Sequence, residues 1–543
     1  MQESVSFESI RGQLGSLTLG GLLRDRAINF RDATYLDQLH PTRNGKEVCT
    51  FSQLKHRADQ ISSALIDRGY RAGDSIAIAG VNSIDWVAVF LGVTQVGMVL
   101  VTLNVRYRRE ELSYMLETSQ ARIAITPATN QGFNLAELYG ELLQELPLLD
   151  DVIFFDDEVD VGHSFSLLRD SFVNESIDEW IEGVKPLDPA VILFTSGTTG
   201  RPKGATITHR SIIASAWAQA EHFGIGSGDS MAGHMPFNHV GGLTCTLITS
   251  MIGASRIHLM ETFSPKGAIE MISTERLTSF SGVPTMFNLI LADPSFASID
   301  TSCVRYVVVG GSNVDPTLAS EIAAAFPKAT IHNLYGLSET SGACIISPLG
   351  DSLALVSTTL GSAIGDFRLK VVDDAGLDVG IDSDGELCVS GDCVVLGYWK
   401  DSLNTASMKD SEGWLRTGDI VQITFDGHVV LRGRKKEMFI QGGFNVYPVE
   451  VENVLAKYPD VALVAGIGVA DSILGEVGRY YIVPKHGSNI DLFGLAQFAK
   501  ERLASYKLPV EYVIAESLPF TPVGKIQKSI LKDVITAPVI RTK

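Results

Sequence analysis

The segment 194–204 carries the residues best suited to chemistry, with the sequence Phe-Thr-Ser-Gly-Thr-Thr-Gly-Arg-Pro-Lys-Gly. It follows an apolar run, 190–195, that predicts a buried strand. Glycines let backbone N–H groups approach an anion closely, hydroxyl groups add donors, and a lysine adds charge. The segment therefore predicts a loop that holds a polyphosphate, although its spacing does not fit a Walker A loop. The residues expected at the phosphates are Thr195, Ser196, Gly197, Thr198, Thr199, Gly200 and Lys203.

Three further segments combine glycine with polar or charged side chains. Residues 335–339 read Tyr-Gly-Leu-Ser-Glu, residues 414–419 read Trp-Leu-Arg-Thr-Gly-Asp, and residues 518–526 read Leu-Pro-Phe-Thr-Pro-Val-Gly-Lys-Ile. A glutamate offers the hard oxygen ligand that Mg²⁺ prefers, and an aspartate accepts two hydrogen bonds from a diol. Residues 336–340 also resemble a hydrolase elbow, G-x-S-x-G, but Thr340 replaces the last glycine, so a serine hydrolase is a poor fit.

Together these segments resemble the motifs of the adenylate-forming superfamily, which includes acyl-CoA synthetases, adenylation domains of peptide synthetases and luciferases. They occur in the order typical of that superfamily and span nearly the whole chain. The stretch 439–450, Phe-Ile-Gln-Gly-Gly-Phe-Asn-Val-Tyr-Pro-Val-Glu, is similar to the acyl-CoA synthetase branch, which has G-G-x-N at this point. The chain departs from the usual pattern at Ser338, where Thr is common, and at Phe520, where that branch often has Arg.

The resemblance implies ATP as a substrate and indicates which residues bind it. Tyr335 would present its ring to adenine, and Asn333 would bond the edge of the base. Asp419 and Arg434 would contact the ribose. The residues implied to bind ATP and AMP, besides the 194–204 loop, are Gly310, Gly311, Asn333, Tyr335, Gly336, Asp419 and Arg434.

The resemblance also implies the catalytic residues. Lys525 would serve adenylation, because a lysine on a glycine turn can reach far into a cleft as a point charge. Glu339 would hold Mg²⁺, and the Ser338 hydroxyl would contact the α-phosphate. His239, in a segment that reads Pro-Phe-Asn-His-Val-Gly-Gly, would position the carboxylate, and Lys436 would be the hinge residue.

Two more sets of residues are implied for CoA and for the acyl group. Gly442 and Gly443 would let the narrow pantetheine arm of CoA pass, because Cβ atoms would obstruct it. Arg106 would meet the CoA phosphates. The residues implied at the acyl group are His239, Gly241, Val283, Gly310 and Gly336.

The expected activity is therefore an ATP-dependent acyl-CoA synthetase that acts on a hydrophobic carboxylic acid, whether fatty, aryl or polycyclic. Its cofactors would be Mg²⁺, ATP and coenzyme A. Three alternatives stay open: an acyl-AMP ligase that loads a carrier protein, a luciferase-like oxygenase, and a nucleotide-binding module without ligase activity.

The amino-acid composition limits the kinds of partner that the protein can bind. The 543 residues include 44 Lys and Arg against 63 Asp and Glu, a formal net charge of −19, which argues against nucleic acid or an anionic membrane as a partner. Six scattered cysteines without C-x-x-C or zinc spacing favour a reducing compartment. We expect a cytoplasmic protein with small-molecule partners, no transmembrane segment and no secretory signal, with a homodimer left open.

The elements that position these residues follow a βαβ pattern. Apolar runs at 75–79, 99–102, 123–126, 152–155, 190–195 and 306–309 predict buried strands, and 51–68 and 109–118 predict helices. The long apolar run 86–103 predicts a buried helix followed by a strand. From residue 360, short runs at 368–373, 385–390 and 428–432 predict an antiparallel β segment.

The expected fold class is α/β. A large N-terminal body, 1–433, would consist of parallel helix-covered sheets plus the antiparallel segment 360–433. A hinge, 434–437, would join it to a small mobile α+β domain, 438–543.

Overall fold

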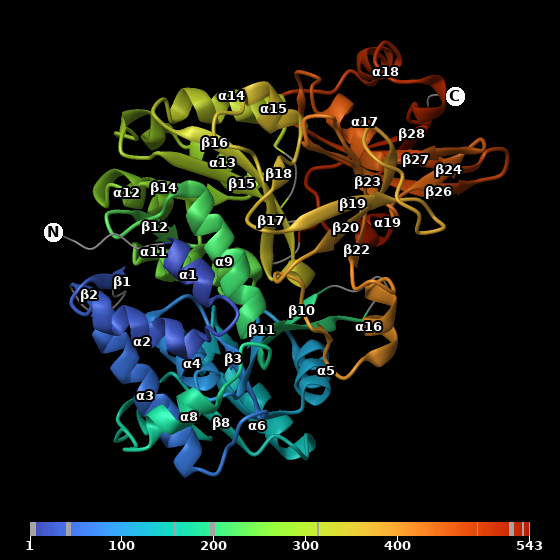
Figure 1. Ribbon diagram of the computed structural model, residues 1–543. Helices are drawn as coiled ribbons and strands as arrows, with labels where there is room; N and C mark the ends of the chain where they lie inside the picture. Colours follow the sequence, from blue (N-terminus) through green and yellow to red (C-terminus); the bar gives the residue numbers. More distant parts are fainter. Residues whose placement is uncertain are drawn as a thin grey trace.

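The computed structural model describes residues 7–39, 45–156, 159, 161–195, 201–311, 314–485, 487–520, 526–534 and 537–541. Figure 1 shows how the elements are arranged along this chain. The predicted site residues that lie outside the described residues are Ser196, Gly197, Thr198, Thr199, Gly200 and Lys525.

An eight-stranded sheet carries the predicted phosphate loop, in the strand order β21-β11-β10-β4-β3-β5-β8-β9. Its strands are β3 (Ser75–Ala79), β4 (Val99–Leu103), β5 (Ala121–Thr126), β8 (Asp151–Phe154), β9 (His163–Ser164), β10 (Pro189–Thr195), β11 (Lys203–Thr208) and β21 (Gly397–Tyr398). The strands from β10 to β9 are parallel, as predicted. Strand β11 returns antiparallel to β10, because residues 196–202 are too few for a crossover helix.

A nine-stranded sheet, in the order β18-β17-β16-β15-β14-β12-β13-β1-β2, forms the second layer. Its strands are β1 (Thr34–Leu39), β2 (Lys46–Thr50), β12 (Ser230–Gly233), β13 (Arg256–Leu259), β14 (Ser279–Gly282), β15 (Tyr306–Gly310), β16 (Thr330–Leu337), β17 (Gly342–Ile346) and β18 (Ser362–Ala363). The inner strands from β1 to β16 are parallel, and β2, β17 and β18 are antiparallel to their neighbours at the two edges.

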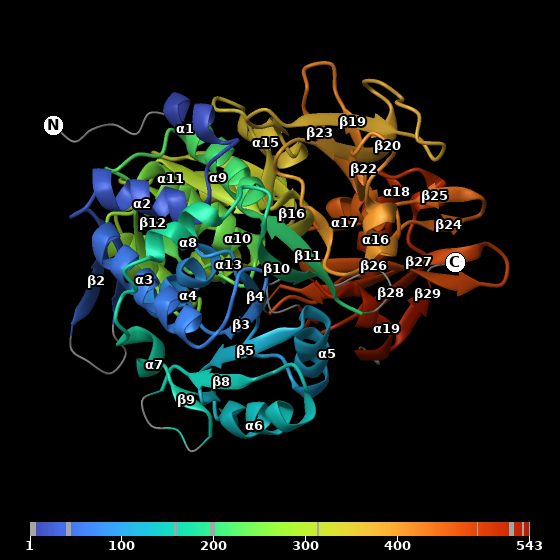
Figure 2. The same cartoon turned by 60° about the horizontal axis from the view of Figure 1, so that its bottom comes forward.

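Helices cover both sheets (Figures 1 and 2). Leu100 of β4 and Ile257 of β13 belong to one core cluster with Phe90 and Ile212 from two of these helices, so the two sheets share a core. The helices of this part are α1 (Phe7–Gln13), α2 (Leu19–Asn29), α3 (Phe51–Asp67), α4 (Ile84–Thr94), α5 (Arg109–Ser119), α6 (Leu135–Glu145), α7 (Ser166–Arg169), α8 (Ile177–Gly183), α9 (His209–Phe223), α11 (Thr249–Gly253), α12 (Pro265–Thr274), α13 (Pro284–Leu291), α14 (Pro316–Ala325), α15 (Leu353–Thr358) and α16 (Ser402–Met408).

The long apolar run 86–103 forms helix α4 and strand β4, as predicted. Helix α4 is apolar around its circumference and is buried along its length, which is typical of a helix inside a large core. No helix in the described part of the chain has the length and apolar character needed to cross a bilayer.

The predicted antiparallel segment is confirmed as a four-stranded sheet of β19 (Arg368–Val372), β20 (Asp384–Ser390), β22 (Leu415–Ile423) and β23 (Val429–Arg434). A separate C-terminal part lies beside it (Figure 1). That part has its own apolar clusters and a six-stranded sheet. Its elements are β24 (Phe439–Gln441), β25 (Phe444–Val446), α17 (Pro448–Leu455), β26 (Val461–Asp471), β27 (Gly475–Pro484), α18 (Leu492–Lys500), β28 (Glu511–Ile514), α19 (Leu531–Val534) and β29 (Val539–Arg541).

A cluster of charged residues joins β1 to β13. Asp37 lies opposite His258 in the parallel ladder and contacts its Nδ1 at 3.0 Å. Lys46 Nζ lies 2.7 Å from both Asp37 and Glu275, and Arg256 also pairs with Asp37. Asp37, His258 and Glu275 could geometrically hold a metal ion, but two cationic side chains already balance the two carboxylates. The cluster is therefore an ion-pair network that stabilises the sheet.

This network predicts a pH dependence of stability. Burial raises the pKa of Asp37, but hydrogen bonds from His258 and Lys46 outweigh it, and the pKa lies below its usual value. A carboxylate whose pKa is lower in the folded state stabilises the fold fully above about pH 4, and the contribution is lost as the pH falls through the folded pKa. We expect Asp37→Asn to lower the free energy of unfolding by about 2 kcal/mol near neutral pH. Urea denaturation of both proteins down to about pH 3 should show this difference shrinking; a constant difference would contradict the assignment.

Candidate functional site

The described ends of the predicted phosphate loop lie side by side. Thr195, the last residue of β10, is paired with Lys203, the first residue of β11. Strand β4 runs parallel to β10, so the residues that follow β4, including Arg106, lie at the same edge of the sheet. Ligands of α/β proteins bind at the carboxyl ends of parallel strands, which is where this loop lies.

Lys203 and Glu339 are connected through Tyr398. The Tyr398 hydroxyl donates a hydrogen bond to Glu339 Oε1 at 2.8 Å. Lys203 Nζ lies 5.3 Å from the centre of the Tyr398 ring and donates to Asn404 Oδ1. Burial, together with the nearby Glu339 carboxylate, raises the pKa of Tyr398, so this hydroxyl stays a donor. The sequence gives no sign of Tyr398 or Asn404, because β21 is only two residues long and pairs with β11 across a long sequence separation.

Asp419 lies at the centre of a second cluster. Its side chain is 2% exposed, and it accepts a hydrogen bond from the Tyr335 hydroxyl at 2.6 Å. Arg434 Nε lies 2.9 Å from the other carboxylate oxygen and faces Asp419 across the β22–β23 ladder. Burial and the Asp419 charge raise the pKa of Tyr335 well above its usual value. The structure thus brings together three predicted nucleotide residues from β16, β22 and β23.

The turn between β16 and β17 holds Ser338 and Glu339. A Cβ atom at Gly336 would lie 2.1 Å from the Gly342 carbonyl oxygen, so only glycine allows the two strands to pack this closely. Ser338 is buried, and Ser341 has a φ of 55°, a conformation that residues with a side chain rarely adopt. The turn is therefore held in a tight and strained form, as functional segments often are.

The residues predicted beside adenine lie on β15 and β16. Asn333 is paired with Val309, the residue before Gly310 at the end of β15. The Asn333 side chain is buried and donates from Nδ2 to the Thr359 carbonyl at 2.9 Å, so part of its hydrogen-bonding capacity serves the fold. Gly311 follows with a φ of 83°, which favours glycine.

The residues predicted at the acyl group share this edge of the nine-stranded sheet. His239 and Gly241 follow β12, and Val283 follows β14, which is parallel to both β12 and β15. His239 Nδ1 accepts a hydrogen bond from the Gly241 N–H at 3.1 Å, at the start of a short helical turn. A π-helix, Leu243–Ile248, continues from this turn, a local geometry that is frequent at functional sites.

The residues predicted to bind CoA lie on exposed parts of the chain. Gly442 and Gly443 form the exposed turn between β24 and β25, with φ of 61° and 87°. In the small sheet β25 is the edge strand and β24 lies between β25 and β27, and both views place β24 on the outer side of the C-terminal part (Figures 1 and 2). Arg106 is exposed, and its backbone N–H bonds Asn104 Oδ1. Lys436 also has an exposed side chain. The surrounding protein still removes part of the water around its ammonium group, and this desolvation together with the Arg434 charge lowers the pKa of Lys436.

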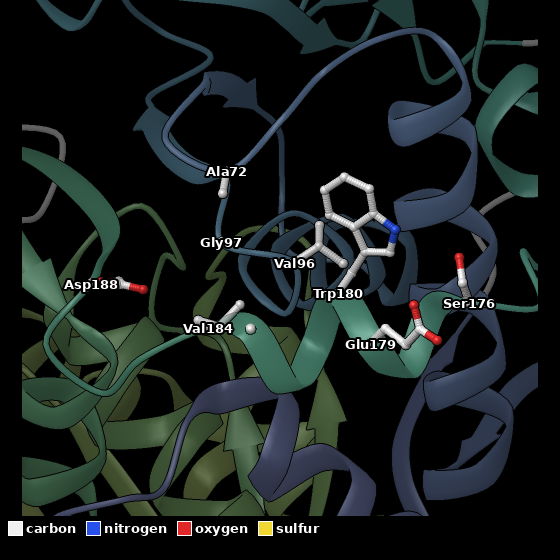
Figure 3. Close-up of a pocket in the computed structure, with 9 residues that line it drawn as sticks. Ala72, Val96, Gly97, Ser176, Glu179, Trp180, Val184 and Asp188 are labelled. Atoms are coloured by element: carbon white, nitrogen blue, oxygen red, sulfur yellow. The ribbon is translucent and has the colours of Figure 1, made fainter.

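An open pocket of about 470 Å³ lies elsewhere, beside α8 (Figure 3). Its lining includes Gly97, which precedes β4, and Asp188, which precedes β10. The pocket therefore lies at the amino ends of these strands, whereas Thr195 lies at the carboxyl end of β10. Arg71 already covers the ring of Trp180 in its wall, with 5.4 Å between the guanidinium carbon and the ring centre. We do not assign this pocket to the site.

Comparisons with known proteins identify the family of the chain. The family model described as AMP-binding enzyme matches residues 23–399, and the model described as AMP-binding enzyme C-terminal domain matches residues 450–525. The chain is 32% identical over 513 residues to the 3-[(3aS,4S,7aS)-7a-methyl-1,5-dioxo-octahydro-1H-inden-4-yl]propanoyl:CoA ligase of Rhodococcus jostii (strain RHA1), which covers 93% of this chain and 97% of that protein. It is 31% identical over 547 residues to the mitochondrial medium-chain acyl-CoA ligase ACSF2 of Homo sapiens, which covers 96% of this chain and 88% of the relative.

Solved structures share the fold. A fatty acyl CoA synthetase of Mycobacterium tuberculosis is 27% identical, with a TM-score of 0.69, over 95% of this chain and 98% of that one. ATP-bound MatB from Rhodopseudomonas palustris is similar in fold, with a TM-score of 0.82 at 23% identity, over 95% of this chain and 99% of that one.

The Asp419 cluster yields a prediction for stability. Asp419→Asn removes the charge that faces Arg434 and weakens the acceptor for Tyr335, so we expect the free energy of unfolding to fall by about 2 kcal/mol. Asp374→Asn is the matched control, because Asp374 pairs with the adjacent Lys435 at 2.7 Å but its side chain is 93% exposed. Exposed ion pairs contribute little to the free energy of unfolding, so the control should have the same urea midpoint as the wild-type protein. Equal urea midpoints for the two variants would show that the Asp419 cluster does not stabilise the fold.

Proposed function

The chain belongs to the acyl-CoA synthetase branch of the AMP-binding enzyme family, and we propose that its Asp419 cluster and Glu339 form the site where a carboxylic acid is adenylated. The activity of this branch is ATP-dependent, AMP-forming ligation of an acid to CoA. The observation that carries the site assignment is the contact of Asp419 and Arg434, which face each other on β22 and β23, with Tyr335, which lies 84 residues before Asp419 in the sequence.

The first step activates the acid. A carboxylate is a poor electrophile because attack adds charge to an anion, whereas its mixed anhydride with AMP has a good leaving group. A carboxylate oxygen of the acid attacks the α-phosphorus of ATP, and pyrophosphate leaves. Lys203 binds phosphate oxygens, and Lys525 neutralises charge that develops at the α-phosphate. Asp419 accepts hydrogen bonds from the ribose hydroxyls, with Tyr335 and Arg434 fixing its orientation.

Glu339 would hold Mg²⁺. Its carboxylate is an oxygen ligand of the kind that Mg²⁺ selects, and a neutral hydroxyl, that of Tyr398, fixes one of its oxygens. When bound, the ion supplies positive charge at the phosphates. Ser338, buried at the start of the same turn, would donate its hydroxyl to the α-phosphate.

The second step transfers the acyl group to CoA. The thiol sulfur attacks the acyl carbon, the carbon–oxygen bond to AMP breaks, and AMP leaves. Because Gly442 and Gly443 lie in the exposed turn of the β24–β25 hairpin, at one edge of the small sheet, we propose that a small domain, 438–543, turns about the hinge 434–437 against the body 1–433. The turn would bring the two glycines to the acyl-AMP, where they line the path of the thiol arm, with Arg106 meeting the CoA phosphates.

The names of two relatives support a hydrophobic substrate. One relative is named for a propanoyl group on a methyl-dioxo-octahydroindene ring system, and another for medium-chain acyl groups. We therefore place the substrate among hydrophobic fatty, aryl or polycyclic acids, with CoA rather than a carrier protein as the acceptor. The six cysteines are free, which fits the proposed cytoplasmic location. The proposal applies equally to a single chain and to a homodimer.

A panel of carboxylic acids tests the proposed reaction. Each acid is incubated with ATP, Mg²⁺ and CoA, and AMP release and thioester mass are measured. We expect a hydrophobic acid to give both products in equal amounts. Acyl-AMP that accumulates with CoA and is consumed only by a carrier protein would indicate the ligase alternative. ATP binding without acid-dependent pyrophosphate release from any acid would contradict the proposal.

Two variants should separate the half-reactions. Lys525→Ala should slow adenylation by about a hundredfold or more, because a charge at the α-phosphate is lost, while thioester formation from supplied acyl-AMP continues. Gly443→Leu should do the reverse, because the side chain obstructs the thiol path. Pyrophosphate release and thioester formation from acyl-AMP are measured separately.

Gly443→Ala is the graded comparison: Ala and Leu are equally unfavourable at a φ of 87°, but a lone Cβ obstructs the thiol path less than a leucine side chain, so we expect a smaller loss of thioester formation. No atom outside its neighbours lies within 4 Å of a Cβ at this position, so both variants should fold alike. Equal loss of both half-reactions in Lys525→Ala, or unchanged thioester formation in Gly443→Leu, would contradict the assigned roles.

A further inference from the structure

The hinge, residues 434–437, forms a bridge between the two parts of the chain. Its first two residues, Arg434 and Lys435, are bonded to the large body. Arg434 pairs with the buried Asp419 at 2.9 Å. The Lys435 backbone N–H donates to the Gly418 carbonyl at 2.9 Å, and its Nζ lies 2.7 Å from Asp374. A backbone hydrogen bond and a pair with a buried carboxylate thus hold residues 434–435 on the antiparallel sheet.

The backbone N–H groups of Glu437 and Met438 close a turn on the Arg434 carbonyl, at 3.0 and 3.1 Å. The Glu437 side chain, in contrast, is bonded to the small part. Lys528 Nζ lies 2.9 Å from Glu437 and 2.7 Å from Glu452 of α17. The three side chains are only 20%, 32% and 13% exposed, so solvent screens them less than surface pairs. Glu452 also accepts the backbone N–H of Gly466 in β26 at 2.6 Å. Lys528 therefore links the end of the bridge to a carboxylate that the small sheet itself holds in place.

We infer that Lys528 is a positioning residue that makes Glu437 part of the small domain and so confines the pivot to Lys436. The inference rests on the proposed function, in which the small domain turns between two half-reactions. Lys436 is the one residue between the segment held by Asp419 and the segment held by Lys528. Lys525 precedes Lys528 by three residues in the sequence.

The charges of the three side chains explain how Lys528 holds Glu437 in place. Glu437 and Glu452 bond the same ammonium, so they face each other across it. Without the ammonium the two carboxylates would repel each other. The repulsion would release Glu437 from α17, and the bridge would bend over several residues instead of one. A loose pivot places Lys525 less accurately, and catalytic rates are sensitive to such misplacement.

Lys528→Met tests the inference, because it keeps most of the stem and removes the charge. Lys507→Met is the matched control: Lys507 pairs with Glu450 at 2.6 Å, both side chains are 23% exposed, and neither lies in the bridge. Three quantities are measured in the full-length protein: the rate of tryptic cleavage after Lys435 and Lys436, acid-dependent pyrophosphate release, and the melting temperature. We expect Lys528→Met to raise the cleavage rate and lower adenylation by about tenfold each, the factor for one lost charged hydrogen bond. Its melting temperature should fall no further than that of Lys507→Met.

Glu437→Ala provides a second route if Lys528→Met fails to fold. It should raise bridge cleavage by a similar factor. The double variant should cleave no faster than Lys528→Met, since Lys528→Met already removes the Lys528–Glu437 pair along with the pair to Glu452. Cleavage and adenylation rates equal to those of Lys507→Met, or additive effects in the double variant, would overturn the inference. The cleavage rate can be measured without enzymatic activity. If the wild-type protein releases no pyrophosphate, the proposed function is overturned, but the cleavage rates of the variants still decide the role of Lys528.

Discussion

A buried carboxylate, that of Asp419, is the interaction on which the rest of the site depends. An almost fully buried charge is costly unless it is paired and hydrogen-bonded, and Tyr335 and Arg434 meet that requirement. In doing so they join strands β16, β22 and β23, which belong to two different sheets. The need to satisfy one charge therefore sets the relative position of the nine-stranded sheet and the antiparallel sheet, and with it the position of the bridge that begins at Arg434.

Much of the fold could be predicted because its signals are local. The buried strand Ser75–Ala79 matches its predicted range, since a short β-branched run between polar turns has few alternatives. Helix α3 begins at Phe51 with a capping box from Thr50 and Gln53, again a local signal. Helix α5 ends at Ser119, one residue beyond its predicted range, because apolar periodicity does not fix where a helix stops.

The site could be predicted only in part, for a physical reason. Motif residues such as Tyr335 and Asp419 stand in recognisable segments, and their convergence is what the structure adds. Tyr398 could not be found, because its role depends on the pairing of a two-residue strand with β11. Lys528 is similar: a lysine near the end of a chain is usually a surface residue, and only the fold places it between Glu437 and Glu452. Long-range pairing, not residue type, decides these positions.

Strand β11 pairs antiparallel to β10, and this pairing limits insertions and deletions in the phosphate loop that connects the two strands. Lys203 is the first paired residue of β11, and β21 with Tyr398 pairs with the same strand. Side chains alternate between the two faces of a strand, so a slip of one residue in the pairing would turn Lys203 to the opposite face of the sheet, away from the Tyr398 ring. Evolution can therefore vary the chemistry of residues 196–202 more freely than their number.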